Sequence, residues 1–176
     1  MKISRYFTNL AQSYLEEIDD LVTDSEGKSV LQRRLKDKRS EMAALLAMID
    51  YSPEMVAVIF YDAFGFESAD VMQKLLQNEP EHAGFPAWDV LRKSLTIAPW
   101  AEPLIATTLK AEGGDAFLVT AAALEFVRTK AAFTASKSEA ADESDDDGDE
   151  SEDEADDLGD AGSDWLVEQG FDTREE

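Results

Sequence analysis

The acidic charge of this chain is concentrated at its C-terminal end. Residues 138–176 hold 19 of the 39 acidic side chains and one of the 16 basic ones, whereas residues 1–137 carry 20 acids and 15 bases. A segment as acidic as the C-terminal part cannot bury enough apolar surface to offset its ordering entropy and its self-repulsion. We therefore predict a folded domain over residues 1–135, a disordered acidic linker over residues 136–164 and a short hydrophobic docking motif over residues 165–176.

Apolar side chains in the first 22 residues recur at steps of three and four. This spacing places them on one face of a helix and leaves acidic residues on the other. The stripe predicts an amphipathic helix of about 20 residues and consists of Ile3, Phe7, Leu10, Tyr14, Ile18 and Leu21.

Start and stop signals divide the rest of the domain into further helices. Ser29–Gln32 resembles a capping box, and Ser52 before Pro53 is typical of a helix start. Together with glycine and proline stops, these signals predict helices over about 29–49, 53–64, 68–76, 88–97, 103–112 and 115–132, the last of them capped by Asp115.

Sustained period-two alternation, the signal of a half-buried strand, is lacking throughout the sequence. We therefore predict the all-α class: a small helical bundle of about six or seven helices followed by a disordered acidic C-terminal tail. The run from Phe117 to Val127 is apolar on nearly every face, which predicts a central position for the last helix.

Motifs that carry catalysis or bind cofactors are missing from the sequence. The chain has no cysteine, and its single histidine, His82, lies in a predicted loop without a partner for a metal or a general base. We therefore expect a non-enzymatic protein without a cofactor or a specific metal site. A stretch from Glu143 to Glu154 imitates the spacing of an EF-hand loop, but it lacks amphipathic helices on either side. It leaves weak divalent-cation binding as an alternative.

The first residues lack a continuous apolar stretch, and the most apolar run of the chain is far shorter than the roughly 20 residues that cross a bilayer. This pattern favours a cytoplasmic protein that does not bind membranes.

Five basic side chains cluster within seven residues of the second predicted helix: Arg33, Arg34, Lys36, Lys38 and Arg39. This basic patch has three interpretations: a solvated helix face, a contact with an acidic partner or with the chain's own tail, and a nucleic-acid contact. The polyanionic tail argues against direct nucleic-acid binding, since it would compete for the same cations.

Large apolar side chains return after the acidic run, and we call Trp165, Leu166, Val167 and Phe171 the C-terminal motif. Exposed Trp and Phe often anchor interfaces. The motif could dock on the chain's own body or on a partner, and the tether would allow the two sites to compete.

These features predict a protein-interaction module, such as an adaptor, an assembly chaperone or an inhibitor. It would bind a protein partner that has a basic or hydrophobic docking groove, through its helical body and the C-terminal motif. One alternative is a DNA mimic whose carboxylates occupy the basic groove of a nucleic-acid-binding protein. A homodimer through the N-terminal helices is also compatible with the sequence.

Overall fold

The computed structural model describes residues 3–25 and 27–142, with side chains described as far as residue 133. The chain divides into two units, Met1–Ser138 and Glu139–Glu176. The fold below concerns the first unit, together with the last helix to its end. The acidic linker beyond residue 142 and the C-terminal motif lie outside the described residues.

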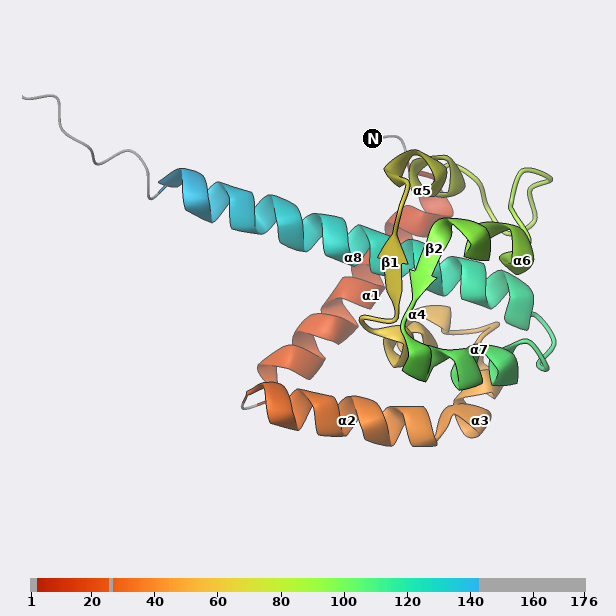
Figure 1. The fold of residues 1–176 in the computed structure, drawn as a ribbon, viewed down its shortest axis with the longest axis horizontal. Helices are drawn as coiled ribbons and strands as arrows, with labels where there is room; N and C mark the ends of the chain where they lie inside the picture. Colours follow the sequence, from red (N-terminus) through yellow and green to blue (C-terminus); the bar gives the residue numbers. More distant parts are fainter. Residues whose placement is uncertain (1–2, 26, 143–176) are drawn as a thin grey trace, which may run out of the picture. The chain divides into compact units, whose positions relative to one another are not determined.

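Helices dominate this part of the chain, which confirms the predicted fold class (Figure 1). The described residues form eight α-helices: α1 (Arg5–Thr23), α2 (Lys28–Ser40), α3 (Met42–Leu45), α4 (Pro53–Ala57), α5 (Ala69–Leu75), α6 (Trp88–Leu91), α7 (Glu102–Thr108) and α8 (Gly114–Asp142). Two short strands, β1 (Phe64–Phe66) and β2 (Leu95–Ile97), pair in antiparallel register, with Gly65 opposite Thr96.

Helix α1 confirms the predicted apolar stripe. Ser4 caps it by accepting a hydrogen bond from the backbone N–H of Phe7 at 3.3 Å. The residues that α1 buries are Phe7, Ala11, Tyr14, Ile18 and Leu21. The stripe thus faces the core, as the periodicity requires.

The capping box predicted at Ser29–Gln32 is wrong. Helix α2 begins one residue earlier, at Lys28, and its N-cap is Gly27 with φ of +100°, a conformation that glycine adopts readily. The predicted 29–49 helix also breaks at Glu41, after which α3 and a 3₁₀ turn complete the segment. This break accounts for the eighth helix.

Ser52 and Pro53 do mark a helix start, since α4 begins at Pro53. The helix is shorter than predicted, however, because the chain passes through a 3₁₀ turn and then extends into β1. The predicted 88–97 helix likewise ends early and continues as β2. Each strand has only three residues, too few for polar and apolar positions to show an alternating pattern.

Helix α8 occupies the centre of the core, as its apolar composition predicts. Leu118, Val119 and Leu124 have no exposed surface, and Phe117 and Phe126 are buried. Asp115 is not the cap, because it lies inside the first turn and accepts a hydrogen bond from the backbone N–H of Trp88. In Figure 1 the first half of this helix runs through the middle of the folded domain.

Candidate functional site

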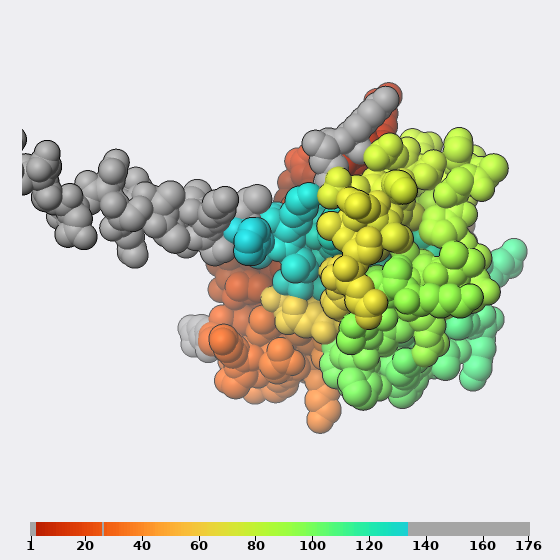
Figure 2. Space-filling view, turned by 45° about the horizontal axis from the view of Figure 1, so that its top comes forward, coloured from red at the N-terminus to blue at the C-terminus, as the bar shows by residue number. Residues whose placement is uncertain are grey.

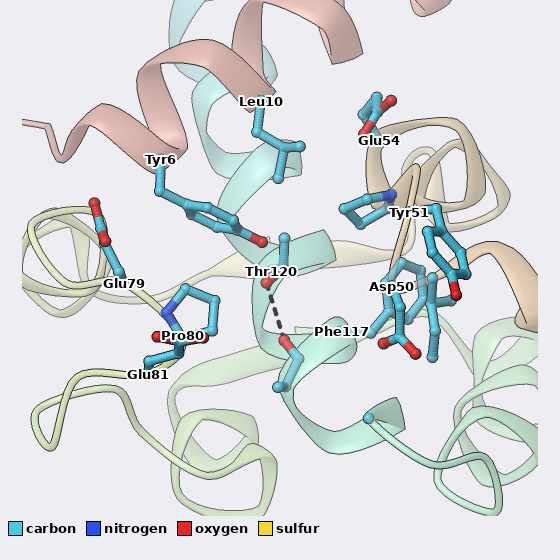
Figure 3. A pocket seen from close by; sticks show the side chains of 14 residues that line it. Tyr6, Leu10, Asp50, Tyr51, Glu54, Glu79, Pro80, Glu81, Phe117 and Thr120 are labelled. Atoms are coloured by element: carbon cyan, nitrogen blue, oxygen red, sulfur yellow. Dashed lines mark hydrogen bonds between the residues drawn. The ribbon is translucent and has the colours of Figure 1, made fainter.

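A pocket of about 610 Å³ opens where α1, the segment before α4, the loop after α5 and the start of α8 meet (Figure 3). We call it the acidic pocket. The residues that line it are Tyr6, Leu10, Ile49, Asp50, Tyr51, Pro53, Glu54, Glu79, Pro80, Glu81, Gly113, Ala116, Phe117 and Thr120.

Two backbone features bring these segments together. The backbone N–H of Ser4 donates a hydrogen bond of 2.8 Å to the carbonyl of Leu76, so the start of α1 is tied to the end of α5. Gly113 has φ of +73°, and a Cβ at this position would lie 3.1 Å from Asp50 Oδ1. Glycine therefore suits both the left-handed turn before α8 and the close approach of Asp50.

The pocket combines apolar side chains with four carboxylates. Ile49 and Phe117 are buried beneath the surface, and Tyr6 and Leu10 are half-buried against the same core. The four acidic lining residues are Asp50, Glu54, Glu79 and Glu81, and no lysine, arginine or histidine lines the pocket. None of the ion pairs within residues 3–25 and 27–133 includes any of the four.

The pKa of Tyr6 reflects the burial and the negative charge of the pocket. Burial raises the pKa of its phenol above the usual value, a hydrogen bond with Thr120 lowers it in part, and the negative charges of Glu54 and Glu79 raise it further. Tyr6 is therefore a neutral hydroxyl at ordinary pH, able to donate or accept a hydrogen bond. The same negative field favours a bound cation.

A second acidic cluster surrounds Glu125 in the middle of α8, and we call it the Glu125 cluster. Tyr14 donates a hydrogen bond to Glu125 Oε1, and the backbone N–H of Asp62 donates one to Oε2 at 2.9 Å. Arg128 donates to both oxygens, at 2.9 and 3.0 Å, and also reaches Asp62 Oδ1 at 2.5 Å. Its guanidinium lies 4.2 Å from the ring centroid of Tyr61.

These contacts give the cluster a structural role. Glu125 has no exposed surface, and both of its oxygens accept hydrogen bonds from protein donors. Burial and the charge of Glu125 raise the pKa of Tyr14 well above its usual value. Burial lowers the pKa of Arg128, but Glu125 and Asp62 outweigh it and raise the pKa overall. Asp62, whose backbone N–H donates to Glu125, has a left-handed φ of +59°.

The five residues of the basic patch do not form one free cationic face. Lys38 pairs with Glu17 at 3.3 Å, and Arg34 lies 3.8 Å from Asp24. The last of the five, Arg39, donates to the carbonyls of Ile59 and Tyr61 and stacks 3.8 Å from the ring centroid of Trp100. The two others, Arg33 and Lys36, are exposed on α2.

His82 lies exposed in the loop after α5, where its Nδ1 accepts a hydrogen bond from the backbone N–H of Gly84 at 3.0 Å. No group of three or more His, Cys, Asp or Glu side chains that could hold a metal occurs within residues 3–25 and 27–133. Across the helices of the described part, none is long and apolar enough to span a membrane.

Sequence reasoning predicted Leu10 and Phe117 as core residues but did not predict the acidic pocket that they line. Its carboxylates come from positions 50, 54, 79 and 81, so no local spacing reveals that the fold gathers them. The predicted C-terminal motif, Trp165, Leu166, Val167 and Phe171, lies outside the described residues.

No protein-family model matches this chain, and no curated protein or solved structure shows significant similarity to it.

Proposed function

We propose that this protein is a non-enzymatic protein-interaction module whose helical body holds a basic segment of a protein partner in the acidic pocket. The observation that carries the proposal is a pocket lined by four carboxylates, no basic side chain, and aromatic and aliphatic residues. Lysine and arginine side chains match this arrangement, because their hydrocarbon stems pack on apolar surface while their charged ends meet carboxylates.

The rim of the pocket supports a macromolecular partner. Tyr51 leaves 87% of its surface exposed at the pocket, and Met55 on the neighbouring helix α4 is also exposed. Tyrosine and methionine are enriched at protein interfaces, where they contribute apolar contact area. A basic side chain in the pocket with partner surface over Tyr51 would use both features.

The C-terminal motif gives the partner a second contact in this proposal. Trp165 and Phe171 are the residue types that anchor interfaces, and a chain segment tethers them to the body. A tethered second contact raises the effective local concentration of the first. The predicted adaptor, chaperone or inhibitor role corresponds to this two-contact arrangement.

The pocket can be tested with simple probes, by nuclear magnetic resonance of the full-length protein. Blocked tripeptides with a central lysine or arginine should shift amide signals around Tyr51, Glu54 and Gly113. A tripeptide with a central glutamine should not, because it lacks the cation. The double variant Glu54→Gln/Glu79→Gln should weaken binding of the basic tripeptides about tenfold, since each exposed charge pair contributes up to ~1 kcal/mol.

The matched control is Glu41→Gln, which removes an exposed carboxylate away from the pocket lining. It should leave the affinity unchanged. Equal shifts with the glutamine tripeptide, or undiminished binding by the double variant, would rule out the acidic pocket as a site for basic side chains.

A further inference from the structure

A second pocket of the folded domain is an apolar groove between α8, from Phe126 to Phe133, and the residues around β1. We call it the phenylalanine groove. Its volume is about 380 Å³, and its lining residues are Phe64, Gly65, Phe66, Ala69, Phe126, Thr129, Lys130 and Phe133. Figure 2 shows these regions, with α8 in cyan beside the yellow residues of β1 and α5.

Aromatic side chains dominate this groove. The rings of Phe66 and Phe126 meet edge to face with centroids 5.2 Å apart, and Phe133 leaves 70% of its surface exposed. Phenylalanine surface of this kind favours aromatic and aliphatic occupants, which gain both apolar burial and ring contacts.

The phenylalanine groove differs in charge from a second groove that α8 also lines. The single charged residue of the phenylalanine groove is Lys130, and no carboxylate lines it. The other groove, between α1 and α8, is lined by Leu15, Glu16, Ile18, Asp19, Val22, Arg128, Ala131 and Ala132, and its arginine already binds Glu125 and Asp62. An apolar segment joined to an acidic chain is repelled by Glu16 and Asp19 but not by the phenylalanine groove.

The chain itself supplies such a segment within reach. Nine helical residues separate Phe133 from the end of α8 at Asp142, about 14 Å at 1.5 Å per residue. The 22 residues from 143 to 164 then lead to Trp165, and a flexible chain of this length spans roughly 25 Å. The spacer therefore exceeds the distance back to the groove.

We infer that the phenylalanine groove is the docking site of the chain's own C-terminal motif, with Trp165 and Phe171 covering the exposed phenylalanine surface in the same molecule. The motif's second apolar pair, Leu166 and Val167, adds aliphatic contact. A partner that binds the motif then has to release it from the groove, so intramolecular docking lowers the apparent affinity for that partner. The inference does not depend on what the acidic pocket binds.

The absence of native cysteine makes a direct test possible in the full-length chain. A nitroxide spin label on Thr173→Cys, just after the motif, broadens amide signals near the place where the motif docks. We expect the amides of Gly65, Ala69 and Thr129 to lose most of their intensity. Clustered broadening at Leu15 and Val22, or no clustered broadening, would overturn the inference.

Three variants and one mixing experiment make this test more specific. Trp165→Ala/Phe171→Ala and, separately, Phe133→Glu should restore the intensities at the groove. Val90→Glu, which charges another exposed apolar side chain of the body, should leave the broadening in place. In a mixture of isotope-labelled chains without the nitroxide and unlabelled chains that carry it, the broadening should vanish. Persistence in the mixture would assign the groove to a second copy instead.

Discussion

The two acidic clusters of this protein use the same functional group in opposite ways. In the Glu125 cluster, a fully buried carboxylate accepts hydrogen bonds from Tyr14, Arg128 and the backbone of Asp62. In the acidic pocket, four carboxylates share a concave surface that contains no basic side chain. A buried charge has to be compensated within the fold, whereas an exposed one can stay hydrated until a ligand arrives.

The contrast shows how burial and hydrogen bonding separate structural carboxylates from those available to a ligand. Burial and saturated hydrogen bonding mark Glu125 as part of the scaffold. Exposure and the absence of an ion pair within the described residues mark Asp50, Glu79 and Glu81 as pocket groups available to a cationic ligand. Stability measurements can test this distinction. Neutralising the carboxylates of the two clusters should change the free energy of unfolding by different amounts and with different signs.

The largest effect is expected for Glu125→Ala. The variant leaves Arg128 and Tyr14 without their buried acceptor, and it should lower the free energy of unfolding by about 3–5 kcal/mol. Urea denaturation followed by circular dichroism measures this change. A loss no larger than that of a surface substitution would show that the cluster does not hold the fold.

An intermediate effect is expected for Tyr14→Phe, which removes one donor from Glu125 and should cost about 1–3 kcal/mol. Because the pKa of Tyr14 is raised in the folded state, the unfolded chain loses this proton first as the pH rises. Stability from Tyr14 is therefore complete below pH about 10 and declines above it.

The pH dependence of the unfolding free energy tests this sign. The alkaline decline should be smaller in Tyr14→Phe than in the parent protein. Tyr51→Phe, which changes an exposed tyrosine, should keep the parent's profile. Identical profiles for the parent and Tyr14→Phe would contradict the assignment.

The smallest effect is expected for Glu79→Gln/Glu81→Gln in the acidic pocket. Both side chains are exposed, so the free energy of unfolding should change by no more than ~0.5 kcal/mol. The sign should be stabilising, since the substitution relieves like-charge repulsion, and the gain should shrink as salt is added. A clear destabilisation by thermal denaturation would place these carboxylates in the scaffold.

Periodicity was enough to predict the longest elements of the fold. The stripe of α1 and the apolar run of α8 extend over several turns, so their burial follows from the sequence alone. Short elements were mispredicted, because β1 and β2 form through pairing between residues about 30 positions apart rather than through local pattern. The break at Glu41 has no glycine or proline to signal it.

The clusters differ in how far the sequence could reveal them. Glu125 stands alone in a strongly apolar helical run, and Arg128 follows three residues later, a signal of a buried ion pair that sequence reasoning could have used. The acidic pocket had no comparable signal. Its lining residues come together only after α1, α8 and the loop behind α5 have packed.

Helix α8 contributes residues to three features, and its helical repeat fixes their relative directions around the helix axis. Phe117 and Thr120 line the acidic pocket, and Phe126 and Phe133 line the phenylalanine groove. Between them in the sequence, Glu125 and Arg128 belong to the Glu125 cluster. One residue inserted after Thr120 would turn everything downstream by about 100° relative to the pocket. A substitution in α8 therefore changes one of the three features, whereas an insertion or deletion within the helix changes how all three are oriented.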